Sequence, residues 1–426
     1  MSIPLLESAT ASDVLDELDH LLITALQTSP RARWERIGAA VGVDASTVAR
    51  RWKRLTEAGH AWMSCHPAGI GPTPPTVAVI EVDCVSGSLH EVAAAIVDDP
   101  HLITIDHVTG SRDLVLTAAF PDQVALARYV GLRLEALPGV AATRSQIAST
   151  VHAVGSRWRL DRLAPGSRED LARDASGGGA GDGRGTSSGG AGGGRGTSSG
   201  GAGIGRGLPS GGGGNGRGLS SGGGGNGRGL PSGGGAGIGR GLPSADDLDL
   251  QLLDLLAQDC RQSVAALAQS SGASASTVRR RLDRFHRADA LVYRCEVARY
   301  LSGWPVAVTF WGVTPPDATA RITAQLITQR ETRLCASLSG PHNLLLTVWL
   351  RSVEDLPSFE ARLYARFPEL TVTDRAVTLW PLKLAGQILD PRGRRIRGVP
   401  VAFWHDPAVE RSEADLIRRL ATPRSG

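Results

Sequence analysis

The sequence predicts an α+β protein in which one two-domain unit is built twice. Residues Leu18 to Gly59 have the spacing of three helices with a tight turn before the third, and the residues after them alternate between strand and helix patterns. The same order returns with Leu248 and Asp249 in the places of Leu18 and Asp19, an offset of 249 − 19 = 230 positions. A glycine-rich stretch separates the copies, so we expect two folded units joined by a flexible connection.

Composition limits the chemistry that the chain can perform. Its 426 residues suffice for roughly two to four domains, and its 46 lysines and arginines barely exceed its 42 acidic residues. This net charge is weak support for a nucleic-acid partner, so the placement of charge matters more. Nearly all the cations are arginines, which bind phosphate and guanine through two parallel hydrogen bonds. An arginine-rich genome explains the same bias equally well.

The sequence contains no recognisable metal, nucleotide or membrane signal. The five cysteines lack the CxxC or CxH spacing of a zinc site, so we expect reduced, structural thiols, with no metal and no cofactor. No Walker-type phosphate loop occurs among the glycines, which argues against nucleotide hydrolysis. No basic segment followed by an apolar run opens the sequence, so we expect no secretion, and no apolar run approaches the ~18 residues of a membrane span. We therefore expect a cytoplasmic protein without membrane contact.

The first domain, residues 1–66, has a helix-turn-helix pattern. Apolar residues recur at helical spacing from Leu18 to Leu26 and again from Trp34 to Val41. Gly42 supplies the turn before a third helix, which in this motif reads the major groove of DNA. Residues Trp62 to Cys65 are expected to form a short wing strand.

The third helix is apolar on one side and cationic on the other. Val48, Trp52 and Leu55 form a stripe that must be buried, and Val278, Leu282 and Phe285 form it in the second copy. Helical geometry places Arg51 near the buried edge of the helix. The residues left to face outward or to lie on a flank are Ser46, Thr47, Arg50, Lys53 and Arg54.

The second domain, residues 67–163, has the order βαββαβ, which is the ferredoxin-like plan of one antiparallel sheet with two helices on one face. The other face of the sheet is also apolar, so we expect it to pack on a second sheet. The expected strands are Val77 to Val82, Leu102 to Val108, Asp113 to Phe120 and Val140 to Ala148, and the expected helices are Leu89 to Val97 and Val124 to Leu137.

Residues 164–245 form a linker that we expect to be disordered. Six degenerate glycine-rich units carry one arginine each, and this composition cannot build a packed core. Spaced Gly-Arg-Gly units are also typical of segments that hold single-stranded nucleic acid. The absence of interleaved aromatic residues favours a simple tether.

The second copy is predicted to contain a helix-turn-helix domain at 246–303 and a ferredoxin-like domain at 304–389. A basic extension, 390–426, follows; we expect it to be irregular, apart from a short helix near Ala414 to Leu420, and to be either a solvated tail or a DNA-backbone contact. The strands of the second sheet are expected at Val306 to Val313, Arg333 to Ser339, Asn343 to Leu350 and Leu370 to Thr378, with helices at Ala318 to Thr328 and Val353 to Phe367.

The junction of these two domains resembles the Lrp/AsnC, or feast/famine, transcription regulators. The resemblance rests on Leu18-Asp19, Val41-Gly42-Val43 and Ser46-Thr47-Val48, followed by a βαββαβ (RAM-type) domain that contains Gly110-Ser111-Arg112-Asp113. It implies a sequence-specific regulator of double-stranded DNA, paired through its sheet domains and responsive to an amino acid or related metabolite. Because two copies are fused, the chain is expected to form an intrachain pseudo-dimer, a homo-oligomer, or both.

The resemblance and the helix geometry together select the candidate DNA contacts. Side chains at the start and outer face of each third helix are best placed for base edges, and the later cations are best placed for phosphates. The second copy has Asp283 where the first has Lys53, so the two half-sites should differ. The candidates are Ser46, Thr47, Arg50, Arg51, Lys53 and Arg54 in the first copy, and Ser276, Thr277, Arg280, Arg281 and Arg284 in the second.

The resemblance also implies an effector site at Gly110, Ser111, Arg112 and Asp113. The second copy has Gly340-Pro341-His342-Asn343 there and lacks both charges, so at most one loop per chain keeps the family's ligand chemistry. A turn that simply requires glycine explains the same residues.

Two other functions fit parts of the sequence. Sirohaem decarboxylases share the two-domain plan but rely on histidine-bearing pockets, whereas His90, His101, His107, His152 and His342 are scattered here without a matching set in both copies. We therefore assign no catalytic residues. The second alternative is a nucleoid-architectural protein that binds DNA with little sequence preference.

Overall fold

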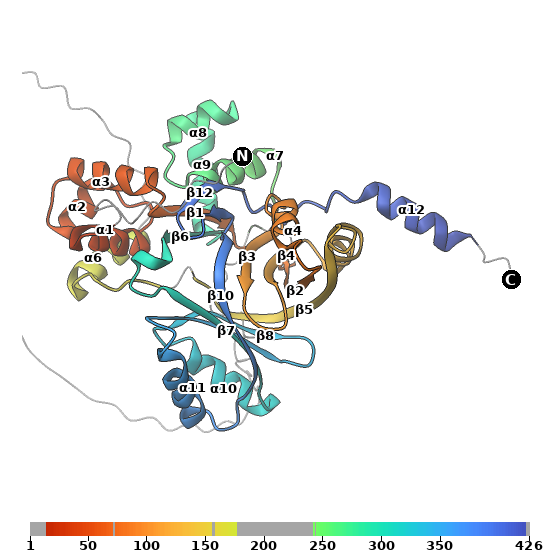
Figure 1. Cartoon of the computed structure of the whole chain (residues 1–426). Helices are drawn as coiled ribbons and strands as arrows, with labels where there is room; N and C mark the ends of the chain where they lie inside the picture. Colours follow the sequence, from red (N-terminus) through yellow and green to blue (C-terminus); the bar gives the residue numbers. More distant parts are fainter. Residues whose placement is uncertain (1–13, 71–72, 156–157, 177–241, 243, 423–426) are drawn as a thin grey trace, which may run out of the picture. The chain divides into compact units, whose positions relative to one another are not determined.

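The computed structural model describes residues 14–70, 73–155, 158–176, 242 and 244–422 (Figure 1). Each copy begins with the three predicted helices. The helices are α1 (Glu17–Thr28), α2 (Trp34–Val41) and α3 (Ala45–Glu57), and then α7 (Asp247–Gln258), α8 (Val264–Ser271) and α9 (Ala275–Arg287). The helix-turn-helix prediction is therefore confirmed in both copies.

Capping residues fix where these helices begin and turn. The Asp16 carboxylate accepts a hydrogen bond from the Asp19 amide, and the Asp19 side chain accepts one from the Asp16 amide, which satisfies two amides at the start of α1. Asp246 and Asp249 repeat this arrangement at α7. The turn before each third helix needs a left-handed residue, and Gly42 takes φ 80° there.

The wing strands join the two copies. β1 (Ala61–Pro67) pairs antiparallel with β6 (Leu291–Val297), so that Ala61 lies opposite Val297. The predicted wing is a strand, but its partner belongs to the other copy. Gln27 of α1 also donates a hydrogen bond of 3.1 Å to the Cys295 carbonyl of β6.

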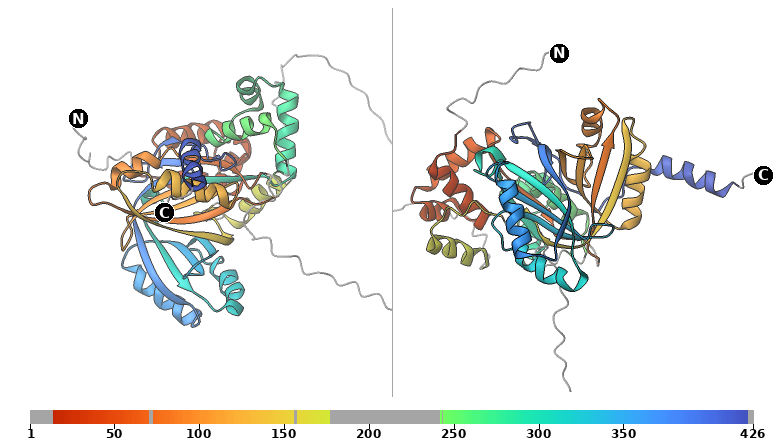
Figure 2. Two further views of the ribbon diagram at one scale, coloured as in Figure 1. Left: turned by 90° about the vertical axis from the view of Figure 1, so that its right-hand side faces the viewer. Right: turned by 60° about the horizontal axis from the view of Figure 1, so that its bottom comes forward.

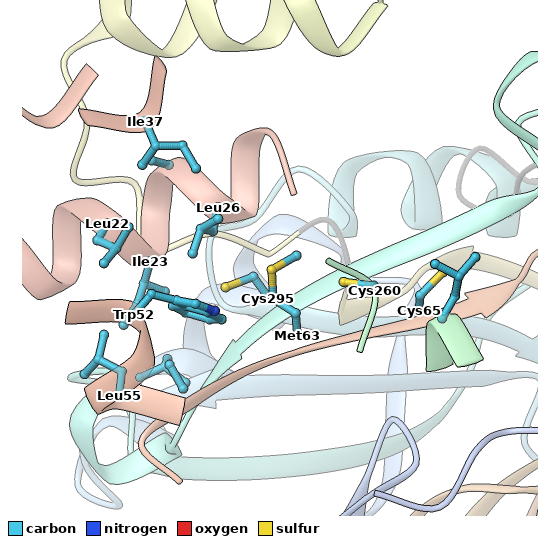
Figure 3. Packing of buried hydrophobic residues seen from close by; sticks show 14 of the residues in the cluster. Leu22, Ile23, Leu26, Ile37, Trp52, Leu55, Met63, Cys65, Cys260 and Cys295 are labelled. Atoms are coloured by element: carbon cyan, nitrogen blue, oxygen red, sulfur yellow. The ribbon is translucent and has the colours of Figure 1, made fainter. Parts of the chain in front are cut away.

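A single buried cluster fills the space around this ribbon. It includes Leu26 and Met63 from the first copy together with Cys260 and Cys295 from the second (Figure 3). All five cysteines have free thiols, and four are buried, as expected for structural residues. The two helix-turn-helix domains therefore share one hydrophobic core.

The ferredoxin-like order is also present twice. The first copy contains β2 (Thr76–Cys84), α4 (Leu89–Ile96), β3 (Leu102–Val108), β4 (Leu114–Phe120), α5 (Gln123–Arg128), the π-helical segment η2 (Tyr129–Leu134) and β5 (Val140–Ala153). The second contains β7 (Val306–Val313), α10 (Pro316–Leu326), β8 (Thr332–Leu338), β9 (Leu344–Leu350), α11 (Asp355–Arg366) and β10 (Thr371–Leu384). A 3₁₀ turn, η4 (Arg299–Leu301), precedes the second sheet.

The two sheets join at both edges and close into a barrel. The strand order is β5-β2-β4-β3 in the first sheet and β10-β7-β9-β8 in the second, with β5 paired to β8 and β10 paired to β3. β5 and β10 exceed their predicted lengths because the second half of each strand pairs with a strand of the other copy. The structure therefore pairs the apolar sheet faces within one chain.

Helices cover the outside of the sheets, and apolar side chains fill part of the inside. In Figure 2 the blue and cyan helices α10 and α11 lie on the outer face of the second sheet. Val79 and Val115 of the first sheet meet Trp311 and Leu345 of the second in the interior. This interior is where the sequence placed the uncovered sheet faces.

Two segments have more structure than the sequence predicted. Part of the supposed linker forms α6 (Pro165–Ser176), because Leu171 packs into the helix-turn-helix core at 2% exposure. Residues 177–241 and 243 of the predicted linker lie outside the described residues.

The short helix expected near Ala414 to Leu420 is present in the C-terminal extension, but the residues before it were wrongly expected to be irregular. A turn at Ala385 and Gly386, both with positive φ, lets the chain fold back and add two strands beside β10. The added elements are β11 (Gln387–Leu389) and β12 (Arg395–Gly398), and α12 (Glu410–Ala421) follows them.

Candidate DNA-binding surface and sheet cavity

The outer face of α3 has the residues that the helical spacing predicted. Val48, Trp52 and Leu55 are buried, whereas Ser46, Arg50 and Lys53 are exposed. Asp44 accepts hydrogen bonds from the Thr47 amide at 2.9 Å and from the Ser46 hydroxyl at 2.5 Å. The hydrogen bonds from Ser46 and Thr47 lower the pKa of Asp44, which therefore stays charged as the cap of the helix.

The flank of each reading helix is tied to the first helix of its domain. Arg51 bonds Asp19 at 3.0 Å, and Arg54 also forms an ion pair with this carboxylate, whose side chain is only 1% exposed. In the second copy Arg281 and Arg284 bind Asp249 in the same way. These four arginines therefore hold the reading helices in place, while Arg54 keeps 58% of its side chain exposed.

The second reading helix presents a different outer face. Ser274 caps α9 by accepting from the Thr277 amide at 3.1 Å, and Ser276 and Arg280 are exposed. Asp283 is exposed where the first copy has Lys53. Neither Arg50 nor Arg280 pairs with a carboxylate among the residues that the structure describes, so both guanidinium groups face solvent.

Two arginines lock the two helix-turn-helix domains together. Arg31 donates to the Cys260 carbonyl, and Arg261 donates to the Pro30 and Ala32 carbonyls at 2.5 and 2.8 Å. The Arg261 guanidinium also lies 3.9 Å from the centre of the Trp34 ring. Burial lowers the pKa of Arg261 to about 10. The two reading helices are therefore parts of one packed body.

The predicted effector loop is used for contacts within the protein. Gly110 has φ +106°, and the equivalent Gly340 has φ +120°, so both turns require glycine. Arg112 is buried and bonds Glu81 at 3.0 Å, and it also forms an ion pair with Asp374 of the second copy.

Asp113 also has a structural partner. Its carboxylate accepts a hydrogen bond from the Cys84 amide at 2.7 Å. In the second copy, the Asn343 side-chain oxygen accepts one from the Thr314 amide at 2.9 Å. Ser111 is exposed, and its hydroxyl accepts a hydrogen bond from the Arg112 guanidinium at 3.2 Å. The sequence reasoning found the turn but did not find these partners.

The sequence reasoning missed a cavity inside the barrel. Its volume is about 190 Å³, and its wall combines both sheets, the β1–β6 ribbon and the C-terminal extension. Most of the lining is apolar, but Asp106, Arg299 and Arg333 also line it. Asp106 alternates with Ile105 on β3 and so lies on the inner face, which is the signal that was available.

The histidines that were considered for a tetrapyrrole pocket lie elsewhere. None of the five histidines that the sequence suggested belongs to the cavity lining. His66 does line the cavity, and burial lowers its pKa to about 4. His101, for example, stacks on Phe120 and bonds the His405 carbonyl at 2.7 Å. The five histidines are His90, His101, His107, His152 and His342.

The described residues lack two further kinds of feature. They contain no group of three or more histidines, cysteines or acidic residues arranged to hold a metal ion. Within the same ranges, no helix combines the length and apolar character needed to cross a bilayer.

Comparisons with known domains match three parts of the chain. The AsnC-type helix-turn-helix domain matches residues 15–56 and 246–286. The Lrp/AsnC ligand binding domain matches residues 77–153. These matches cover both reading helices and the first sheet domain.

Curated relatives match over the span of one copy. The HTH-type transcriptional regulator FL11 of Pyrococcus horikoshii is 27% identical over 141 residues, which is 32% of this chain and 91% of the relative. FL11 of Pyrococcus furiosus is 26% identical over 142 residues, which is 33% of this chain and 92% of the relative.

Solved structures with similar folds are more distant. The siroheme decarboxylase NirDL is 12% identical with a TM-score of 0.48, over 96% of this chain and 100% of that one. AsnC of E. coli is 21% identical with a TM-score of 0.29, over 32% of this chain and 92% of that one. Both likenesses are too weak to assign a role.

Proposed function

We propose that the chain is a tandem DNA-binding transcription regulator of the Lrp/AsnC type, and that α3 and α9 together read one asymmetric operator. Arg50 and Arg280 carry this proposal. They occupy equivalent positions, 280 − 50 = 230, on the exposed faces of two helices that belong to one packed body. Arginine on such a face binds guanine through two parallel hydrogen bonds.

We assign roles to the remaining candidates by their partners. Ser46, Thr47, Ser276 and Thr277 lie at helix starts and are assigned to base edges or adjacent phosphates. Arg51 and Arg281 are assigned to positioning, because their guanidinium groups already bind Asp19 and Asp249. The cations Lys53, Arg54 and Arg284 are assigned to the phosphate backbone, with part of each side chain exposed.

The two half-sites should differ because the two reading helices differ. Asp283 repels phosphate where Lys53 attracts it, so the second helix should approach the backbone less closely. An aspartate on this face can instead accept from a cytosine amine. An operator for this chain therefore need not be palindromic, unlike one that a symmetric dimer reads.

An effector is part of the proposal. An amino acid or related metabolite at the Gly110 to Asp113 loop would meet the Ser111 side chain and the loop backbone, because Arg112 and Asp113 are already engaged. The same loop lies at the junction of the two sheets, where a ligand would bear on their pairing. Further assembly of whole chains would use surfaces other than the sheet faces that pair within the chain.

Selection of binding sites from random duplex DNA tests this function. We expect one enriched sequence with two unlike half-sites, and footprints in which the halves lie about one helical turn or a multiple of it apart. Enrichment of a palindrome would contradict the asymmetric reading. Equal binding to all sequences at physiological salt would instead indicate an architectural protein.

A further inference from the structure

The barrel cavity lies between the two copies and away from the loop assigned to the effector. Its wall includes Val79 and Val115 of the first sheet and Leu345 of the second. Trp62 of the β1–β6 ribbon and Phe403 of the C-terminal extension also line it. The cavity therefore exists because the sheets, the ribbon and the extension fold together.

The charged residues of the wall leave an excess of positive charge. Arg294 and Arg333 share one carboxylate, Glu296, through hydrogen bonds of 2.6 and 2.9 Å. Arg299 and Asp106 complete the charged set. Burial raises the pKa of Asp106 to about 7, so this acid is partly neutral near neutral pH.

Arg299 is the cation with the most unused hydrogen-bonding capacity. One of its terminal nitrogens donates to the Thr378 carbonyl at 3.3 Å. Asp106 attracts the Arg299 guanidinium electrostatically but does not form a direct ion pair with it. A guanidinium carries five donors and is costly to bury without anionic partners. Arg299 therefore presents unused donors to the cavity, and Asp106 offsets its positive charge only in part.

We propose that this cavity binds a small apolar carboxylate, with the ligand's carboxylate on Arg299 and its hydrocarbon body against the apolar wall. A cavity of about 150 Å³ holds a benzene molecule, so about 190 Å³ suits a ring with a short acidic side chain. An apolar lining with a few polar groups that orient the ligand is typical of small-molecule sites.

The position of the cavity gives binding a route to the helix-turn-helix domains. Trp62 and Val297 of the β1–β6 ribbon contribute to its wall. Other residues of the same ribbon pack with α1 and α7 in the shared hydrophobic core. Occupancy is therefore expected to change the affinity for DNA. This regulatory step rests on the proposed function, whereas binding of the ligand does not.

Calorimetric titration of the full chain with phenylacetate tests the site. Phenylacetate should bind with a stoichiometry of one, whereas phenethylamine, with the same ring and the opposite charge, should not bind. Arg299→Gln should weaken phenylacetate at least about tenfold, because a charged hydrogen bond is lost. Arg321→Gln on α10, where Arg321 forms an exposed pair with Glu369, is the matched control and should bind as the parent chain does.

Two further variants keep the test decisive if Arg299→Gln does not fold. Asp106→Asn should bind phenylacetate as well as or better than the parent, because it removes a nearby anion. Ala307→Phe should fill the cavity and abolish binding while the unfolding midpoint stays within a few degrees. The proposal is overturned if phenylacetate does not bind the parent chain, or if it binds Ala307→Phe as tightly as the parent. It is also overturned if the parent prefers phenylalanine to phenylacetate and Asp106→Asn removes that preference.

Discussion

The Arg112 guanidinium lies 4.2 Å from the centre of the Trp311 indole ring, which belongs to the other copy. On its other side it bonds the Glu81 carboxylate at 3.0 Å. Glu81 and Trp311 are equivalent positions, 311 − 81 = 230, so one arginine of the first copy spans the junction between the two. Its counterpart His342 instead bonds Thr373 at 2.8 Å.

Replacing Arg112 with methionine should weaken the pairing of the sheets. It leaves Asp374 without its cation and Glu81 with Arg144 alone, and the loss from a buried ion pair is about 3 kcal/mol. Urea unfolding followed by tryptophan fluorescence measures this. Arg375→Met, at the half-exposed pair with Glu360, should cost less than about 1 kcal/mol. Equal losses in the two variants would show that Arg112 has no special role.

Asp19→Ala should destabilise the first helix-turn-helix domain by about 3 to 5 kcal/mol, because a buried carboxylate that binds Arg51 and Arg54 is removed. Asp249→Ala should have a comparable effect on the second domain. Thermal unfolding monitored by circular dichroism is the measurement. The control is Glu57→Ala, which removes an exposed pair with Lys53 and should cost about 0.5 kcal/mol or less.

Asp106 should make the protein less stable as pH rises. Burial raises its folded pKa from 3.8 to about 7, so the folded state holds a proton that the unfolded state releases. The stability that this proton contributes is fully present below about pH 4 and is lost as pH rises toward 7. The loss in the free energy of unfolding is at most about 1.4 kcal/mol per unit of difference between the folded and unfolded pKa. Urea midpoints of the parent chain and Asp106→Asn at pH 5 and pH 7.5 measure it.

The comparison with Asp106→Asn separates this effect from opposing ones. Burial lowers the pKa of His66, His101 and His152, so these residues destabilise the protein as pH falls. The parent chain and Asp106→Asn both contain these histidines, so their effect on stability cancels when the two proteins are compared. A difference between the parent and Asp106→Asn that stays constant from pH 5 to pH 7.5 would show that Asp106 keeps an ordinary pKa.

Phe403→Ala should cost about 3 kcal/mol, because the side chain is 4% exposed and packs on Ala119 at the inner face of the first sheet. Leu420→Ala on α12 is the control, since Leu420 is 76% exposed, and it should be nearly neutral. Differential scanning calorimetry compares them. A neutral Phe403→Ala would mean that packing of the extension on the first sheet does not stabilise the protein.

The elements that local pattern defines were predictable from the sequence. α2 and β3 have the predicted bounds, because Gly42 and the alternation after Pro100 mark their limits locally. The buried and exposed faces of α3 also followed from helical spacing, and Arg51 lies near the buried edge as expected. These features depend on residues a few positions apart.

The features that the sequence did not reveal depend on distant residues. The partner of β1 lies in β6, and β5 and β10 continue past their predicted ends because the other copy provides an edge. α6 was missed because one leucine, Leu171, decides whether that segment packs. The ion pairs of Arg54 and Arg284 were missed because Asp19 and Asp249 lie far away in sequence.

The proposed function depends most directly on the reading of base edges by Arg50 and Arg280. Binding of the double variant Arg50→Ala and Arg280→Ala should therefore be measured by fluorescence anisotropy on the selected operator and on random duplex, at one salt concentration. We expect the operator to lose about 1 to 3 kcal/mol of binding free energy per arginine, and the random duplex to lose clearly less. Equal losses on both duplexes would contradict the claim, because they would show that these arginines contact only phosphate.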